Sequence, residues 1–160
     1  MGDIRHGDQS ARTQRGGPPP GTRVIVDVYA DGQPGAVTFK HEWRFDDNSR
    51  KGNGEIDIPA KKKDEDGTPI QFNLHDRTRP KVGLKFVNDD NAMWSDRTIC
   101  PQYDAAWDSE ITSIRPSERV LHVVDLNKDE CVLHYNLRFE PDPQTYCYDP
   151  EIRNGGTTVA

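Results

Sequence analysis

Hydrophobic and polar residues alternate along much of this 160-residue chain, which is the pattern of half-buried β-strands. The clearest run covers residues 37–45, where every second residue is apolar or aromatic or is a histidine. These residues are Val37, Phe39, His41, Trp43 and Phe45. The intervening Thr, Lys, Glu and Arg residues indicate that the other side of the strand faces water. The same alternation predicts strands at 22–29, 55–58, 70–75, 82–87, 111–114, 120–126, 131–139 and 145–152.

About nine short strands with turn-rich connections, and no convincing amphipathic helix, predict an all-β protein. We expect one immunoglobulin-like, two-sheet β-sandwich domain over residues 22–152. The turn residues at 31–35 would join the first two strands. The composition of residues 1–21 predicts a disordered, basic, Gly/Pro-rich tail, and residues 153–160, rich in Gly and Thr, predict a flexible C-terminus.

The net charge of the chain limits the kinds of molecule that it can bind. The formal net charge is −6, and residues 22–152 hold 17 of the 21 basic and 25 of the 27 acidic residues, a net of −8. An acidic body argues against nucleic acid as the main partner. Because the chain has neither an apolar run of membrane-spanning length nor a signal-peptide pattern, we expect no membrane association and a cytoplasmic location. Three cysteines without CxxC spacing predict reduced thiols rather than disulfides or zinc ligands, and no cofactor is expected.

The long irregular segment 88–110 is the candidate ligand site, because loops of this length are often functional. Its candidate residues are Asp89, Asp90, Trp94, Tyr103 and Trp107. The three rings could plug one end of the sandwich, or they could present a platform to a sugar. We expect the plug, because a core poor in aliphatic residues needs these rings inside. Pro101 could begin a short helix that runs through Trp107.

Histidines supply the only candidate metal ligands. If Asp125 pairs with Cys131 across a hairpin, His122 lies directly opposite His134, close enough to share a metal ion. No third ligand is evident, so these two remain weak candidates and no metal site is predicted. His41 lies on an apolar strand face and is expected to be a core histidine with its hydrogen bonds satisfied.

Signatures of catalysis are missing from the sequence. It has no phosphate-binding Gly loop, no nucleophile elbow and no HExxH zinc motif, so no catalytic residues are predicted. Residues 125–130 begin like a calcium loop, but they lack the glycine and the final glutamate and are better interpreted as a hairpin turn. His75 precedes Asp76 at a strand end, and the two are expected to form a surface pair.

The last hairpin carries a family resemblance. Residues 133–139 read Leu-His-Tyr-Asn-Leu-Arg-Phe, residues 140–143 read Glu-Pro-Asp-Pro, and residues 146–152 read Tyr-Cys-Tyr-Asp-Pro-Glu-Ile. This stretch resembles the C-terminal hairpin of bacterial DP-EP family proteins and, more loosely, that of the AidA/PixA inclusion-body family. The resemblance implies a β-sandwich, with cytoplasmic accumulation or sugar binding in some members, and not an enzyme.

The sequence therefore supports three functional hypotheses. The first is a non-enzymatic binding or self-assembly module whose partner is another protein or a second copy of the chain. The alternative is lectin-like binding of a small carbohydrate through the 88–110 loop. A metal-dependent hydrolase that uses His122 and His134 is a distant third.

Overall fold

The computed structural model describes residues 21–98 and 107–158, and within them the chain is all-β. The one helical element in this part is a 3-10 turn, η1 (Asp90–Ala92). None of the helices that the structure describes is both long and apolar enough to cross a membrane. The predicted tail at 1–21 lies outside the described residues except for Gly21.

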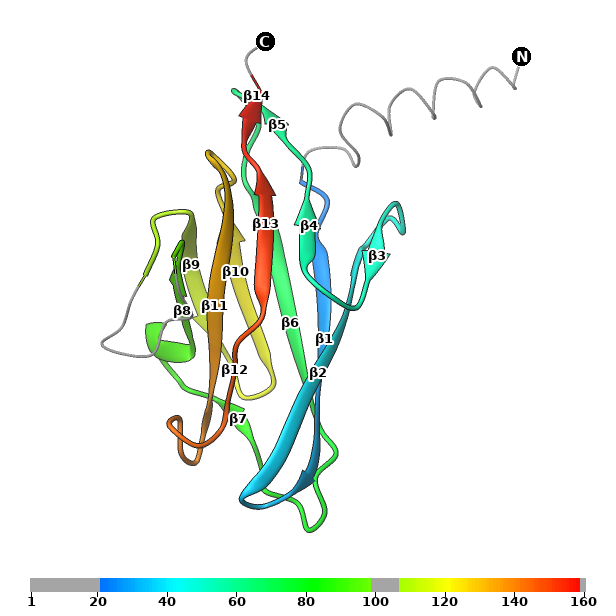
Figure 1. Cartoon of the computed structure of the whole chain (residues 1–160), viewed down its shortest axis with the longest axis vertical. Coiled ribbons are helices and arrows are strands. Elements are labelled where there is room, and N and C mark those ends of the chain that lie inside the picture. Colours follow the sequence, from blue (N-terminus) through cyan, green and yellow to red (C-terminus); the bar gives the residue numbers. More distant parts are fainter. Residues whose placement is uncertain (1–20, 99–106, 159–160) are drawn as a thin grey trace, which may run out of the picture.

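The first sheet has six strands in the order β3-β2-β1-β6-β10-β9 (Figure 1). They are β1 (Val24–Gln33), β2 (Ala36–Phe45), β3 (Lys51–Gly52), β6 (Thr68–Asp76), β9 (Ile111–Pro116) and β10 (Val120–Asp125). β1 and β2 form the expected hairpin, in which Gln33 pairs with Ala36 and only Pro34 and Gly35 lie in the turn. β1 also pairs with β6 in parallel, so this sheet is mixed.

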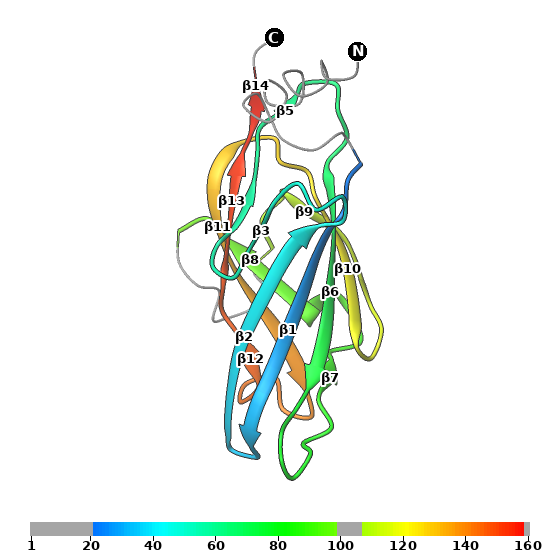
Figure 2. The same cartoon turned by 90° about the vertical axis from the view of Figure 1, so that its right-hand side faces the viewer.

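The second sheet is built around the long strand β11 (Glu130–Glu140). Its order is β12-β11-β13-β4, and β7 and β8 also pair with β11. Figure 2 shows the first sheet in front of this second sheet. The other strands are β4 (Ile56–Ile58), β7 (Lys85–Phe86), β8 (Met93–Asp96), β12 (Cys147–Tyr148) and β13 (Glu151–Gly155). A separate small ladder joins β5 (Lys61–Lys62) to β14 (Thr157–Thr158).

The two sheets stack face to face over one hydrophobic core, which is a sandwich-like arrangement. Period-2 alternation places one side of each main strand in this core. The core residues of β1, β6 and β11 are Val24, Val26, Val28, Ala30, Ile70, Phe72, Leu74, Leu133, Tyr135, Leu137 and Phe139. Rings meet between the layers: Phe39 stacks on Phe139 with centroids 5.3 Å apart, and Phe72 lies 5.7 Å from Tyr135.

The expected hairpin between residues 120–126 and 131–139 is wrong. β10 pairs with β6 and β9 in the first sheet, whereas β11 belongs to the second sheet. The connection at 126–129 therefore crosses from one layer to the other. Local turn chemistry does not distinguish a hairpin from such a crossover, because both need the same polar and turn-forming residues.

The predicted bounds of two other strands, at 82–87 and 145–152, also differ from the structure. The strand expected at 82–87 is reduced to β7, and the one at 145–152 is divided into β12 and β13 around Asp149 and Pro150. Residues 153–158, which we expected to be flexible, lie mostly in β13 and β14. β13 pairs with β11 and β4, and β14 pairs with β5, so this C-terminal segment is held by strand pairing. Asn154 of β13 is fully buried.

Candidate functional site

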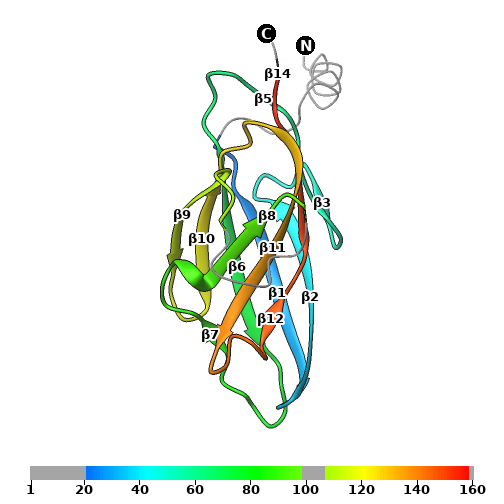
Figure 3. The ribbon, with the colours of Figure 1, turned by 60° about the vertical axis from the view of Figure 1, so that its left-hand side comes forward.

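The outer surface of the second sheet carries the most unusual side chains in the described structure. Since Tyr135, Leu137 and Phe139 point into the core, the alternating residues Asn136 and Arg138 project from the opposite surface of β11. Both are nevertheless buried, with only 5% and 8% of their surface exposed. β8 is the neighbouring strand of β11 in the sheet, and η1 leads into it (Figure 3).

Arg138 is the central residue of this surface. Its guanidinium lies over the ring of Trp94, 3.7 Å from the ring centroid, and Trp94 stands opposite Asn136 in the β8–β11 ladder. In the described part of the chain no carboxylate or other acceptor is bonded to this guanidinium. Burial lowers the pKa of Arg138. The nearby Cys147, Asp89 and Glu140 raise it, but by less. No nitrogen of Arg138 is fully buried without a partner, so its N–H groups stay within reach of water or of a ligand.

Asn136 adds a second incomplete group beside Arg138. Its Nδ2 donates a short hydrogen bond to Asp149 Oδ1, whereas its buried Oδ1 has no partner among the described residues. Cys147 pairs with Arg138 across the β11–β12 ladder. Burial raises the pKa of Cys147, with a further contribution from Asp149, and burial also raises the pKa of Asp149. We call Trp94, Asn136, Arg138, Cys147 and Asp149 the Trp94–Arg138 cluster.

Of the two tryptophans of the candidate loop, only Trp94 is buried as expected. Trp94 is 9% exposed, although it lies outside the main core cluster, whereas Trp107 is 48% exposed. The prediction that Trp107 plugs the sandwich is therefore wrong. Its indole Nε1 donates to the backbone oxygens of Asp90 (3.2 Å) and Met93 (3.1 Å), which ties an open ring to η1 and β8.

The remaining residues predicted for the ligand site are partly accounted for. Asp89 caps η1 by accepting a hydrogen bond from Asn91 N at 2.8 Å, and the side chain of Asn91 accepts one from Trp94 Nε1 at 2.9 Å. Asp89 and Asp90 are both exposed. Tyr103 and the helix expected from Pro101 lie outside the described residues. The structure thus brings Asp89, Asp90, Trp94 and Trp107 together around η1.

The proposed histidine pair does not form. His122 pairs across the first sheet with Gln71 and Arg115, whereas His134 lies on the second sheet, 3.1 Å from Glu151. Across residues 21–98 and 107–158 there is no group of three or more His, Cys, Asp and Glu side chains that could hold a metal ion.

His41 is confirmed as a buried histidine with both ring nitrogens bonded. Nδ1 lies 2.6 Å from the hydroxyl of Tyr148, and Nε2 lies 2.7 Å from the carbonyl oxygen of Gly54. Burial lowers the pKa of His41, more strongly than the bond to Gly54 raises it. The histidine therefore links the two sheets as a neutral group.

A buried acidic group supports the crossover between the layers. Asp125 Oδ1 accepts hydrogen bonds from Asn127 N and Asn154 Nδ2, and Oδ2 has no partner among the described residues. Glu110 accepts hydrogen bonds from the backbone N–H groups of Lys128 and Asp129. This cluster fixes the connection into β11, so we interpret it as structural.

Sequence reasoning missed Arg138 and Asn136 because their alternation marks them only as outward-facing. Nothing in the Leu-Arg-Phe run shows that the Trp94 ring, from the neighbouring strand β8, lies against Arg138. The one signal in the sequence was the short apolar run Ala92-Met93-Trp94 within a polar segment. The fold and the cluster together define an all-β, sandwich-like protein with an incompletely bonded polar site. Comparison of the chain with models of known protein families and with curated proteins finds no match.

Proposed function

We propose that this protein is a non-enzymatic binding module with an immunoglobulin-like sandwich fold, and that the Trp94–Arg138 cluster and Trp107 bind an acidic carbohydrate. The single observation that carries the proposal is Arg138, a cation held against Trp94 whose N–H groups are not fully buried and have no partner among the described residues. A ligand carboxylate could form a bidentate, charge-assisted pair with this guanidinium.

The neighbouring groups favour a saccharide among the possible acidic ligands. Sugar rings stack on exposed aromatic faces, and Trp107 provides such a face beside η1. Sugar hydroxyls both donate and accept, so they can donate to the exposed carboxylates of Asp89 and Asp90. This is the lectin-like hypothesis, with the ligand made more specific by Arg138.

Binding is favoured over catalysis at this site. The thiol of Cys147 is the nearest nucleophile, and its raised pKa keeps it protonated at neutral pH, which opposes nucleophilic attack. The hydrolase hypothesis depended on His122 and His134, which stand on different sheets. The resemblance of the last hairpin to DP-EP family proteins also supports a binding role.

We further propose a cytoplasmic location. Cys131 and Cys147 are free thiols, and burial raises the pKa of both, that of Cys131 to about 11. Protonated, partly buried thiols are stable in a reducing compartment and need no oxidative pairing there.

Binding can be measured on an array of uronic-acid-containing and neutral oligosaccharides, followed by calorimetry with the best acidic one. We expect the Arg138→Lys variant to bind at least about tenfold more weakly, because lysine cannot make a bidentate contact with a carboxylate. Arg115→Lys, an exposed arginine on the first sheet, is the matched control and should bind as the wild type does.

The Trp107→Ala variant tests whether sugar binding can be lost without unfolding. This exposed ring can be removed without opening the core, so the variant should melt like the wild type but lose affinity for the sugar. Equal binding by wild type, Arg138→Lys and Trp107→Ala would reject the proposal. Concentration-dependent self-association without any sugar binding would instead support the assembly hypothesis.

A further inference from the structure

A second site lies at the far end of the sandwich from β5 and β14. The loop that joins β6 to β7 covers residues 77–84 and lies beside the β1–β2 turn (Figures 1 and 2). Its backbone is attached to the end of β1, since Arg77 N donates to Ala30 O and Arg79 N donates to Gly32 O, both at 2.8 Å. We call residues 77–84 the basic loop.

Asp76 holds the basic loop in one conformation. The expected surface pair of His75 and Asp76 is wrong, because His75 bonds Asp27 at 2.8 Å and Asp76 is buried. Asp76 Oδ1 accepts from the N–H and hydroxyl of Thr78, and Oδ2 accepts from two backbone N–H groups, those of Gly83 and Leu84, at 2.9 Å each. Although burial opposes ionisation, these hydrogen bonds hold the pKa of Asp76 below its ordinary value.

The carboxylates around the loop are already engaged: Asp31 is paired with a cation, and Asp76 stays ionised but is fully hydrogen-bonded. Arg77 makes a bidentate contact with Asp31, with distances of 2.9 and 2.8 Å, and lies over the ring of Tyr29 at 4.5 Å. The four hydrogen bonds to Asp76 occupy both of its oxygens. The acids at this end therefore offer little attraction for other cations.

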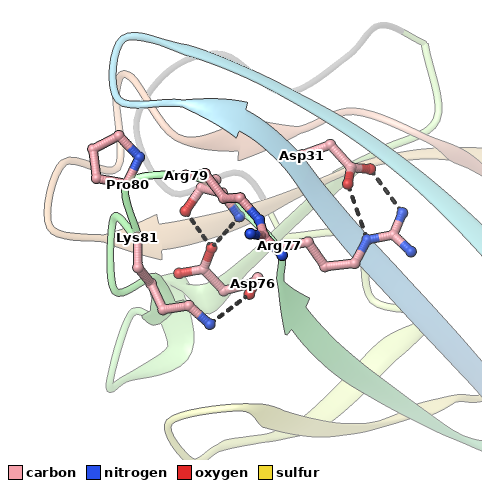
Figure 4. A pocket seen from close by; sticks show the side chains of 7 residues that line it. Asp31, Asp76, Arg77, Arg79, Pro80 and Lys81 are labelled. Atoms are coloured by element: carbon pink, nitrogen blue, oxygen red, sulfur yellow. Dashed lines mark hydrogen bonds and ion pairs between the residues drawn. The ribbon is translucent and has the colours of Figure 1, made fainter.

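Two cations remain without a carboxylate partner among the described residues, so the hollow keeps a net positive charge even with Asp76 ionised. Arg79 and Lys81 are exposed, and neither forms an ion pair with an Asp or Glu of residues 21–98 and 107–158. Lys81 Nζ donates to the backbone oxygen of Asp76 at 3.0 Å, which positions the ammonium group but leaves its charge. Both line a hollow of about 690 Å³ together with Asp31, Asp76, Arg77, Thr78 and Pro80 (Figure 4).

From this arrangement we propose that the hollow binds a small, multiply charged oxyanion, a phosphate ester or a polycarboxylate, through Arg79 and Lys81. A loop fixed by Asp76 and by β1 presents both cations without paying the ordering cost of a flexible segment. The chain as a whole has a net charge of −6, so it repels large acidic partners. A local excess of positive charge in the hollow can still attract a small anion. This site is independent of the carbohydrate site on the second sheet.

The test is a titration of the full-length protein, followed by the backbone amide signals in NMR at constant ionic strength. The probes are pyrophosphate and citrate, with chloride as the control anion. We expect saturable shifts confined to residues 77–84 for at least one probe, and none with chloride. Saturation by pyrophosphate alone would identify a phosphate site, and saturation by citrate alone would identify a carboxylate site.

Variants separate a specific site from general charge attraction. Arg79→Ala and Lys81→Ala should each weaken binding about tenfold, whereas Lys63→Ala, an exposed lysine on the β5–β6 connection, should leave it unchanged. All three change exposed side chains, so unchanged melting temperatures will confirm that the fold is intact. Non-saturating shifts with both probes, or equal effects of Lys63→Ala and Arg79→Ala, would overturn the proposal.

Discussion

Replacing Trp94 with alanine should lower the free energy of unfolding by about 3–5 kcal/mol, the usual cost of deleting a buried tryptophan. Trp94 is 9% exposed, donates its indole N–H to Asn91 and supports the guanidinium of Arg138. The substitution leaves a cavity and exposes a cation that has no other partner among the described residues. Because a domain of this size is stable by only about 5–15 kcal/mol, the variant will be close to unfolding.

Trp107→Ala is the matched control for this experiment. It removes the same ring from the same segment, but from a position that is 48% exposed, so it should cost no more than about 1 kcal/mol. Urea unfolding followed by far-UV circular dichroism measures both changes. If Trp107→Ala proves as destabilising as Trp94→Ala, the assignment of the buried and exposed tryptophans is incorrect.

Raising the pH from 5 to 8 should destabilise the protein through Asp125, by an amount of the order of 2 kcal/mol. Burial raises the pKa of this carboxyl to about 7, and Glu110 and Asp108 add to the shift, against the hydrogen bonds from Asn154 and Asn127. An unfolded aspartate ionises near pH 3.9, so the unfolded state loses its proton first. The contribution of Asp125 to stability is therefore complete below about pH 4 and is lost as the pH rises through about 7.

Asp125→Asn isolates this effect. The asparagine Oδ1 can still accept from Asn127 and Asn154, but the side chain no longer ionises, so most of the loss between pH 5 and 8 should disappear. Comparison of the two proteins also cancels the contribution of His41, which acts in the opposite direction because burial lowers its pKa. An identical pH dependence in both proteins, measured by urea unfolding, would show that Asp125 is ionised in the folded state throughout this range.

Period-2 alternation identified the strands that have one buried and one exposed side. It failed for strands that are buried on both sides. β1, β2 and β6 alternate cleanly because one side of each faces the core and the other faces water. β8 was missed because three of its four residues are buried, so Met93, Trp94 and Ser95 show no alternation. β11 was found, but its outward residues were taken to be solvated, although Asn136 and Arg138 are covered.

The candidate site was predictable in composition and not in geometry. Aromatic rings and acids in residues 88–110 singled out this segment, and the structure gathers Asp89, Asp90, Trp94 and Trp107 around η1. Which ring is buried depends on the pairing of β8 with β11, a contact between residues about 40 positions apart. The histidine pair failed for the same reason: a wrong partner for β10 places His122 and His134 side by side, whereas the actual pairing separates them by a whole layer of the protein.

The position of β4 has a consequence for synthesis of the chain. Ile56 and Ile58 are fully buried, yet the only strand with which β4 pairs in the described residues is β13, where Ile56 lies opposite Ile152. During translation, β4 leaves the ribosome about 95 residues before its partner, so its hydrophobic side stays unpaired while those residues are made. The second sheet therefore closes only after β13 has been made, and ribosome-bound chains that stop before residue 151 will expose an unpaired apolar strand to chaperones and to one another.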